Sequence, residues 1–239
     1  MHVMLASRLF ALVALSIGLA PLSGCTGATA GADLTVRPTS RPLSKYAGKV
    51  LRVPQDEKFA LTQAPATQAP GLEGKAEGKA ECESSGKGKV AAKVEKGGTA
   101  SGTFQLGHSV KNDGERQIDL TVRVKMNYEY AAEAEPANAR GKAAVSLNLF
   151  VRDGRNRLLQ TYGLVAQSSE EGKLSSKAGK EAEFTLTLGP GDAATVYLAG
   201  VADANLRDGE SGQAKLQVSD VSFEFESRAA PEVKAADAP

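Results

Sequence analysis

The sequence is poor in aromatic side chains. It contains no Trp, and Phe and Tyr together make up 5% of its 239 residues. A core built around large rings is therefore excluded, and we expect a small, aliphatic core. The same shortage argues against a platform for binding sugars, because such platforms usually consist of exposed aromatic rings.

The chain also lacks a surplus of charge of either sign. Its formal net charge is +1, and residues 1–24 contain a single charged side chain, Arg8. The remaining residues carry 28 basic and 28 acidic side chains. A protein that binds nucleic acid by neutralising phosphates needs a basic surplus. This balance therefore excludes nucleic acid as the expected partner.

Side chains that commonly carry catalysis are scarce. Only one His, His108, lies beyond residue 24, and the two Cys residues are Cys25 and Cys82. A Ser-His-Asp triad would have to use His108, and a zinc site would need more His and Cys than the chain contains. His108 alternates in step with Phe104 and Leu106, which predicts a His packed on a strand. We therefore expect the protein not to be an enzyme.

The first 24 residues have the pattern of a targeting segment that is removed from the mature chain. Arg8 precedes an apolar run from Leu9 to Leu19. This run is shorter than the roughly 20 apolar residues that a membrane-spanning helix needs. After Ala20 the chain reads Pro-Leu-Ser-Gly-Cys, and the segment ends just before Cys25.

The sequence Leu22-Ser23-Gly24-Cys25 resembles the signal box of bacterial lipoproteins. The resemblance implies that Cys25 carries lipid and becomes the first residue after cleavage. Stable anchoring requires more than one acyl chain, which this modification supplies. Because Thr26 is not acidic, the same resemblance implies a cell-envelope protein at the outer rather than the inner membrane. The alternative is an ordinary secretory signal followed by an incidental Cys.

If lipid occupies Cys25, Cys82 has no intramolecular partner for a disulfide. Cys82 stands between Glu81 and Glu83, whose negative charge disfavours the thiolate. We expect an unpaired thiol without a catalytic role, and an intermolecular disulfide is the alternative.

Residues 25–86 are predicted to form a tether. They include two short repeats, Thr-Gln-Ala-Pro within 62–70 and Glu-Gly-Lys-Ala within 73–81. Little apolar surface is present there to offset the chain entropy lost on folding, so we expect disorder. A tether of about 60 residues would reach about 40–50 Å. Residues 46–61 hold a few apolar side chains and are either an added strand or part of this tether.

From residue 87 to residue 227 apolar and polar residues alternate. In the longest run, Ile118–Tyr130, every second residue is apolar or Tyr, which indicates a long strand with one buried face. The phase of the alternation changes at Ser219-Asp220, which predicts a β-bulge or a strand that changes sheet. Turn signals such as Asp153-Gly154 separate the runs.

These runs, without any helical periodicity, predict an all-β fold. We expect an antiparallel two-sheet β-sandwich over residues 87–227, either jelly-roll-like or immunoglobulin-like. A disordered tail is expected at 228–239.

Part of this region resembles β-sandwich domains of secreted bacterial proteins whose function is unassigned. The resemblance rests on strand and turn patterns such as Ala144-x-x-Leu147-x-Leu149-x-Val151-x-Asp153 and Phe184-x-Leu186-x-Leu188-Gly189-Pro190-Gly191. It implies the fold and a location outside the cytoplasm, and it implies no activity.

Calcium is the metal that the sequence favours most. Asp203, Asp208 and Glu210 fall in one expected loop, and oxygen-rich loops of this kind bind Ca²⁺. The spacing does not match the twelve-residue calcium loop, and Asp in turns often serves the local backbone instead. We therefore name these three residues as the candidate ligands of a structural calcium ion, without expecting any other cofactor.

Two rings are candidates for a sugar-binding platform. Phe150 and Tyr197 lie on the opposite parity from their apolar neighbours, which would direct them to solvent. The alternative is that both strands are covered on both faces.

Together these observations predict a lipid-anchored cell-envelope protein. It would display a non-catalytic β-sandwich for binding or for a structural role, with an envelope protein, a cell-wall polymer or a glycan as partner. A calcium-stabilised carbohydrate-binding module is the alternative.

Overall fold

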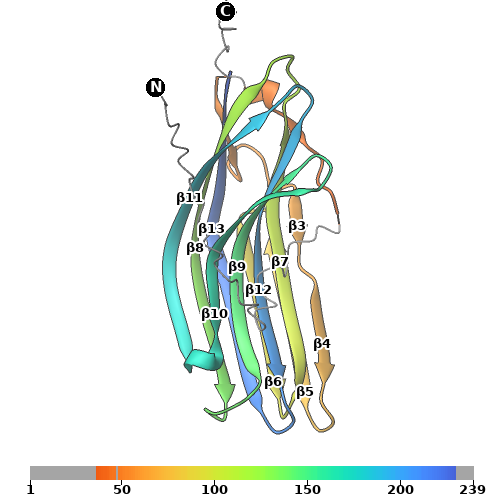
Figure 1. Ribbon diagram of the computed structural model, residues 1–239, viewed down its shortest axis with the longest axis vertical. Coiled ribbons are helices and arrows are strands. Elements are labelled where there is room, and N and C mark those ends of the chain that lie inside the picture. Colours follow the sequence, from red (N-terminus) through yellow and green to blue (C-terminus); the bar gives the residue numbers. More distant parts are fainter. Residues whose placement is uncertain (1–35, 47, 230–239) are drawn as a thin grey trace, which may run out of the picture.

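The computed structural model describes residues 36–46 and 48–229, which form a two-sheet β-sandwich (Figure 1). The expected all-β sandwich is therefore confirmed. The predicted signal segment, Cys25 and residues 230–239 lie outside the described residues. Arg228 and Ala229, assigned above to the tail, are the last residues of a strand.

The first part of the chain contributes short elements, and the longer strands follow. The short elements are β1 (Arg41–Pro42), the 3₁₀ turn η2 (Leu43–Tyr46), β2 (Val50–Val53), β3 (Leu61–Gln63) and β4 (Ala66–Pro70). The longer strands are β5 (Lys75–Glu83), β6 (Lys87–Glu95), β7 (Gly98–Lys111), β8 (Ile118–Glu135), β9 (Lys142–Asp153), β10 (Leu158–Ser168), β11 (Leu174–Leu188), β12 (Ala193–Leu206) and β13 (Ser211–Ala229), with the 3₁₀ turn η3 (Ser169–Glu171) between β10 and β11.

One sheet has seven strands and the other has six. One sheet has the order β1-β7-β12-β9-β10, and β3 and β4 also pair with β7. The other has the order β11-β8-β13-β6-β5, and β2 also pairs with β13. All pairings are antiparallel except that of β1 with β7.

Strand β8 shows why these residues form strands. Leu120, Val122 and Val124 face the other sheet and are fully buried, whereas the alternating Arg123 and Lys125 face solvent. Strand β11 pairs with β8 without a register shift, and β13 pairs with its other edge. The strand that the alternation predicted is therefore present, and it lies in the interior of its sheet.

The predicted change of phase in the last strand is a β-bulge. The register between β13 and β8 shifts between Ser219 and Ser222, and Asp220 adopts a φ of 54°. The extra residue changes the parity of the strand. Val218 before the bulge and Phe223 after it consequently both point into the core.

Residues 46–61 belong to the sandwich rather than to a tether. Strand β2 pairs with the end of β13, and Leu51 and Val53 are completely buried. Strand β3 begins at Leu61 and pairs with β7. Of the two alternatives for this segment, the added strand is therefore correct.

The prediction of disorder over residues 62–86 is wrong, because both repeats form strands. The Thr-Gln-Ala-Pro repeat supplies β4, and the Glu-Gly-Lys-Ala repeat supplies β5. The second repeat alternates charged and small residues, so every second side chain of β5 is Ala, Gly or Cys and points inward.

Small inward residues let β5 approach the opposite sheet closely. A Cβ atom at Gly78 would lie 2.5 Å from the carbonyl oxygens of Ser101 on β7 and Thr67 on β4. The Gly78 N–H also donates to the Gln68 side chain at 3.3 Å. Backbone pairing and close packing thus replace the burial of large apolar side chains, whose scarcity suggested disorder.

This close approach predicts that Gly78→Val is destabilising. Added methyl groups must displace backbone, which costs about 1–3 kcal/mol in a well-packed site. Urea unfolding followed by circular dichroism measures the difference. The matched change Lys79→Val alters the neighbouring, solvent-facing position and should stay within about 0.5 kcal/mol of the wild type. Equal stabilities of the two variants would contradict the packing of β5 against β7 and β4.

Candidate functional site

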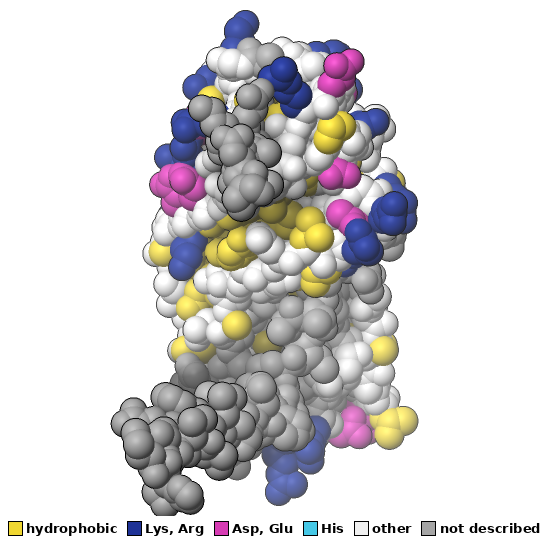
Figure 2. Space-filling model, turned by 45° about the horizontal axis from the view of Figure 1, so that its top comes forward, with side chains coloured by type: hydrophobic (Ala, Val, Ile, Leu, Met, Phe, Trp, Pro, Cys, Tyr) yellow, Lys and Arg dark blue, Asp and Glu magenta, His cyan; other side chains and the backbone are white. Residues whose placement is uncertain are grey.

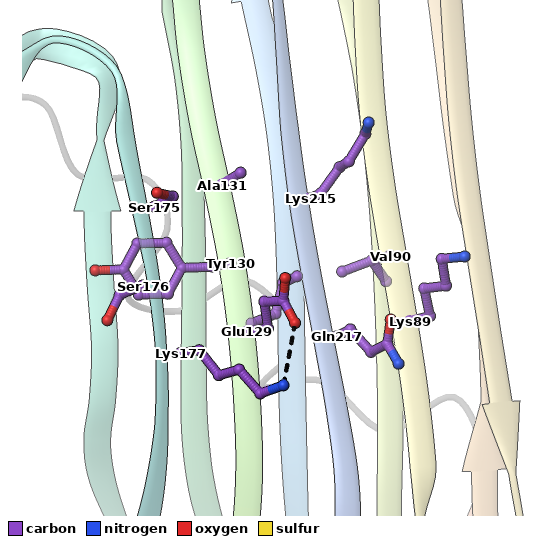
Figure 3. Close-up of a pocket in the computed structure, with 11 residues that line it drawn as sticks. Lys89, Val90, Glu129, Tyr130, Ala131, Ser175, Ser176, Lys177, Lys215 and Gln217 are labelled. Atoms are coloured by element: carbon purple, nitrogen blue, oxygen red, sulfur yellow. Dashed lines mark ion pairs between the residues drawn. The ribbon is translucent and has the colours of Figure 1, made fainter.

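A groove of about 470 Å³ runs across the solvent-facing side of the sheet that contains β11, β8, β13 and β6 (Figure 3). Its lining residues come from all four strands. They are Lys89, Val90, Glu129, Tyr130, Ala131, Ser175, Ser176, Lys177, Lys215, Leu216 and Gln217.

The register of the strands arranges the outward side chains of this groove in two adjacent rows. One row consists of cross-strand neighbours that can all form hydrogen bonds, namely Lys177, Glu129, Gln217 and Lys89. The second row alternates polar and small residues, namely Ser175, Ala131 and Lys215, and continues beyond the groove lining to Ala91. The small side chain of Ala131 leaves space between the longer side chains of the groove.

The charge of the groove is positive. It contains Lys89, Lys177 and Lys215 but only one carboxylate, Glu129. The Lys177 Nζ lies 3.9 Å from a Glu129 carboxylate oxygen, the contact dashed in Figure 3. Within the described chain, Lys89 and Lys215 form no ion pair, so their ammonium groups are open to an anion or to hydroxyl oxygens.

None of the groove residues stands out in the sequence. They are recognised only from two facts taken together. The side chains of the two rows point outward on four neighbouring strands, and Ala131 and Ala91 lie in the same cross-strand row. That alignment depends on strand register, which the alternation of one strand does not specify.

The proposed sugar platform of Phe150 and Tyr197 is contradicted by the structure. The two side chains are 1% and 0% exposed. Their rings stack with centroids 5.2 Å apart, and they form a small apolar cluster with Leu61 and Ala199. The Tyr197 hydroxyl accepts a hydrogen bond from Arg152 Nε at 3.1 Å. Both faces of these strands are packed, as in the alternative interpretation.

The three carboxylates proposed for calcium do not assemble into a site. Among the described residues, no group of three or more His, Cys, Asp or Glu side chains could hold a metal ion. Asp203 lies on β12, where burial raises the pKa of its carboxyl and a hydrogen bond with Ser101 opposes the shift. Asp208 is exposed in the turn before β13.

Glu210 serves the backbone instead of a metal. Its carboxylate accepts N–H groups from Arg140 at 2.7 Å, Gly141 at 2.9 Å and Arg207 at 3.0 Å. These hydrogen bonds hold the pKa of Glu210 below its ordinary value. The residue thus joins the β8–β9 loop to the β12–β13 turn. These hydrogen bonds occupy both of its carboxylate oxygens.

His108 is packed in the core, as its parity predicted. It is fully buried and tilts against Phe225, with ring centroids 5.9 Å apart. Its Nε2 lies 3.7 Å from the Glu57 carboxylate, which also forms an ion pair with Arg41 at 2.8 Å and accepts a hydrogen bond from Tyr46. Glu57 and Tyr46 belong to residues 46–61, for which the sequence left an added strand and a tether as alternatives, so it did not indicate this cluster.

The thiol of Cys82 is not poised for reaction. Cys82 forms no disulfide within the described part of the chain, and its Sγ contacts the Gln105 carbonyl oxygen at 3.4 Å. Burial raises the pKa of this thiol to about 12. At neutral pH the side chain is therefore a neutral thiol at the inner face of β5.

The sequence matches no protein-family model and no curated protein. Among residues 36–46 and 48–229, none of the helical segments has the length and apolar character to cross a bilayer.

Several solved structures are weakly similar to this chain. They include the enzymatically active domain of tailspike protein 4 from bacteriophage CBA120, with 10% identity over 72% of this chain and a TM-score of 0.26. The chain spans only 20% of that tailspike chain. A structure described as CBM4 has 13% identity, covers 68% of this chain and 86% of its own, and has a TM-score of 0.25.

A family 11 carbohydrate-binding module from Clostridium thermocellum, solved with a mixed-linked tetrasaccharide, is similar in the same way. It has 11% identity, covers 73% of this chain and 94% of its own, and has a TM-score of 0.24.

The surroundings of His108 predict a pH-dependent stability. Burial lowers the pKa of His108 from 6.5 to about 4, against the opposing effect of Glu57. Between these values the unfolded chain binds a proton that the folded chain does not. Protonation of His108 in the unfolded chain therefore lowers the free energy of unfolding as the pH falls from about 6.5 towards 4. Above about pH 6.5 this loss of stability is absent.

The substitution His108→Phe should flatten the dependence of stability on pH between about 6.5 and 4. The measurement is the urea midpoint of wild type and variant at intervals from pH 7 to pH 4, at about 0.15 M salt so that exposed charges are screened alike. Parallel profiles for the two proteins over this range would show that His108 does not titrate with folding.

Proposed function

We propose that the protein is a lipid-anchored component of the cell envelope, held at the outer membrane through Cys25. The observation that supports the anchor is Leu22-Ser23-Gly24-Cys25 directly after an apolar run. At this location the β-sandwich would act as a binding module that does not catalyse a reaction. Its only His among the described residues, His108, is sealed in the core and cannot contact a substrate.

The span of chain between lipid and module is much shorter than expected. Strand pairing already begins at Arg41, and Arg37 contacts the β9–β10 hairpin. The residues from Cys25 to Val36 extend at most about 40 Å, at about 3.3–3.6 Å for each residue. We therefore propose that the module works next to the membrane rather than at the end of a long tether.

The groove on the outer sheet is the proposed binding site, and an anionic envelope glycan or cell-wall polymer is its proposed ligand. The single observation that supports this choice is the pair of polar rows, in which three Lys side chains accompany one Glu. Ammonium groups bind carboxylate or phosphate, and Gln217 and Ser175 can bind sugar hydroxyls. Calcium and the Phe150–Tyr197 platform are not part of this proposal.

Metabolic labelling tests the anchor. Cells that express the full chain and are fed labelled palmitate should yield a labelled protein in the membrane fraction, because the modified Cys25 carries acyl chains. The variant Cys25→Ala should lose the label. A Cys82→Ala variant, which changes the other Cys, should keep it. Label that persists in Cys25→Ala would overturn the anchor.

Charge reversal tests the groove. The double variant Lys89→Glu/Lys215→Glu should bind polygalacturonate at least about tenfold more weakly than wild type, a change of about 1.4 kcal/mol. The control Lys79→Glu/Lys93→Glu reverses two exposed lysines of β5 and β6 outside the groove lining. Calorimetric titration at two salt concentrations provides the measurement. Equal losses in both variants would mean that the groove is not the binding site.

A further inference from the structure

The described chain begins at one end of the sandwich, beside the β9–β10 hairpin. Arg37 Nη2 donates a hydrogen bond to the Arg155 carbonyl oxygen at 3.4 Å. The same end carries the turns between β7 and β8 and between β11 and β12, at the top of Figure 1. Any lipid on Cys25 is therefore connected to the sandwich at this hairpin.

Exposed apolar side chains concentrate where the chain enters this end. Among the described residues, four large hydrophobic side chains are exposed. Three of them lie in the entering segment and the hairpin, namely Val36 at 61%, Leu158 at 48% and Leu159 at 49%. The fourth, Leu72, lies in the turn between β4 and β5.

A β-bulge accounts for the exposure of two consecutive leucines. The register between β10 and β9 shifts between Leu158 and Gln160, so Leu159 has no residue opposite it. In a regular strand one of two neighbouring side chains would face the core. Strand β10 is also the last strand in its sheet, so the leucines border open solvent.

Basic side chains lie beside Leu159. Lys111, Arg155 and Arg157 line one cavity of about 660 Å³ together with Leu159. Figure 2 turns this end forward and shows basic and some acidic side chains interspersed with exposed apolar ones. Arg37 adds a further positive charge beside Arg155.

The acidic residues of the same cavity are engaged locally. Asp153 accepts the backbone N–H groups of Arg155 and Arg157 and pairs with the Arg157 side chain at 2.6 Å. Asp192 accepts the Gly189 N–H at 2.9 Å. Among the described residues, Lys111, Arg155 and Arg37 form no ion pair, so their charged groups are open to a partner.

We propose that this hairpin end, defined by Val36, Arg37, Lys111, Arg155, Arg157, Leu158 and Leu159, docks on a membrane surface containing anionic phospholipid. Basic side chains are attracted to anionic headgroups, and leucines enter the interface between headgroups and acyl chains. The inference rests on the proposed function in one respect, since lipid on Cys25 would hold the hairpin end beside the bilayer. The leucines and arginines supply a second, weaker attachment.

Vesicle flotation tests the docking without the acyl chains. The mature chain carrying Cys25→Ser is mixed with vesicles of phosphatidylethanolamine and phosphatidylglycerol, and in parallel with vesicles of phosphatidylcholine alone. Binding is expected to the anionic vesicles, to be weaker on the neutral ones and to fall with added salt. Absence of binding to the anionic vesicles overturns the proposal. The palmitate label reports on Cys25 separately, so failure of docking and failure of the anchor are distinguishable.

Two variants separate the apolar and the basic contributions. Leu158→Ser/Leu159→Ser and Arg37→Glu/Arg155→Glu should each reduce binding to anionic vesicles about fivefold or more. Leu72→Ser, which changes an even more exposed leucine elsewhere, should bind as wild type does. Thermal unfolding establishes that all variants are folded.

The same variants identify a different occupant if there is one. Size-exclusion chromatography with light scattering gives the oligomeric state of wild type and leucine variant. A wild-type dimer that the leucine variant loses, without any change in vesicle binding, would assign this surface to a second copy of the chain and overturn docking on lipid.

Discussion

The antiparallel ladder between β8 and β13 holds the six-stranded sheet together, because these two strands are the longest and every other strand of the sheet pairs with one of them or with β6. The ladder continues past the bulge at Asp220, so one strand can keep its apolar side chains in the core along its whole length. The other half of the core, on β7, β12 and β9, packs against the surface that this ladder creates. Outward side chains of the same two strands line part of the groove. The strand register that forms the core therefore also positions the site.

The alternation of apolar residues was enough to predict β8 and the bulge in β13, because both depend on burial of one strand face. It failed for β5, where the alternation is between charged and small residues and Gly78 serves close approach rather than apolar burial. It also failed for Phe150 and Tyr197, because a strand with two packed faces has no solvent-facing parity. The groove could not be predicted for a third reason: Lys89, Gln217, Glu129 and Lys177 become neighbours only once four strands are in register.

Carboxylates organise the loops of this sandwich, and one of them, Glu210, had suggested a metal site. Glu210 binds three backbone N–H groups, Asp153 closes the β9–β10 hairpin, and Glu57 joins Arg41 and Tyr46 beside the buried His108. In each case donors from the local backbone or from arginine satisfy oxygens that could otherwise bind a cation. A chain with balanced charge and few large apolar residues thus uses its acids to fix the connections between long strands.

The length of β8 sets a distance between the two proposed surfaces. Ile118 lies at the hairpin end of the sandwich, and Glu129 and Ala131 lie in the groove on the same strand. At about 3.3 Å for each residue, the groove is about 36–43 Å from that end. A sandwich standing on its hairpin end would therefore hold the groove clear of the lipid headgroups, at a height that adding or removing residue pairs in the strands would change.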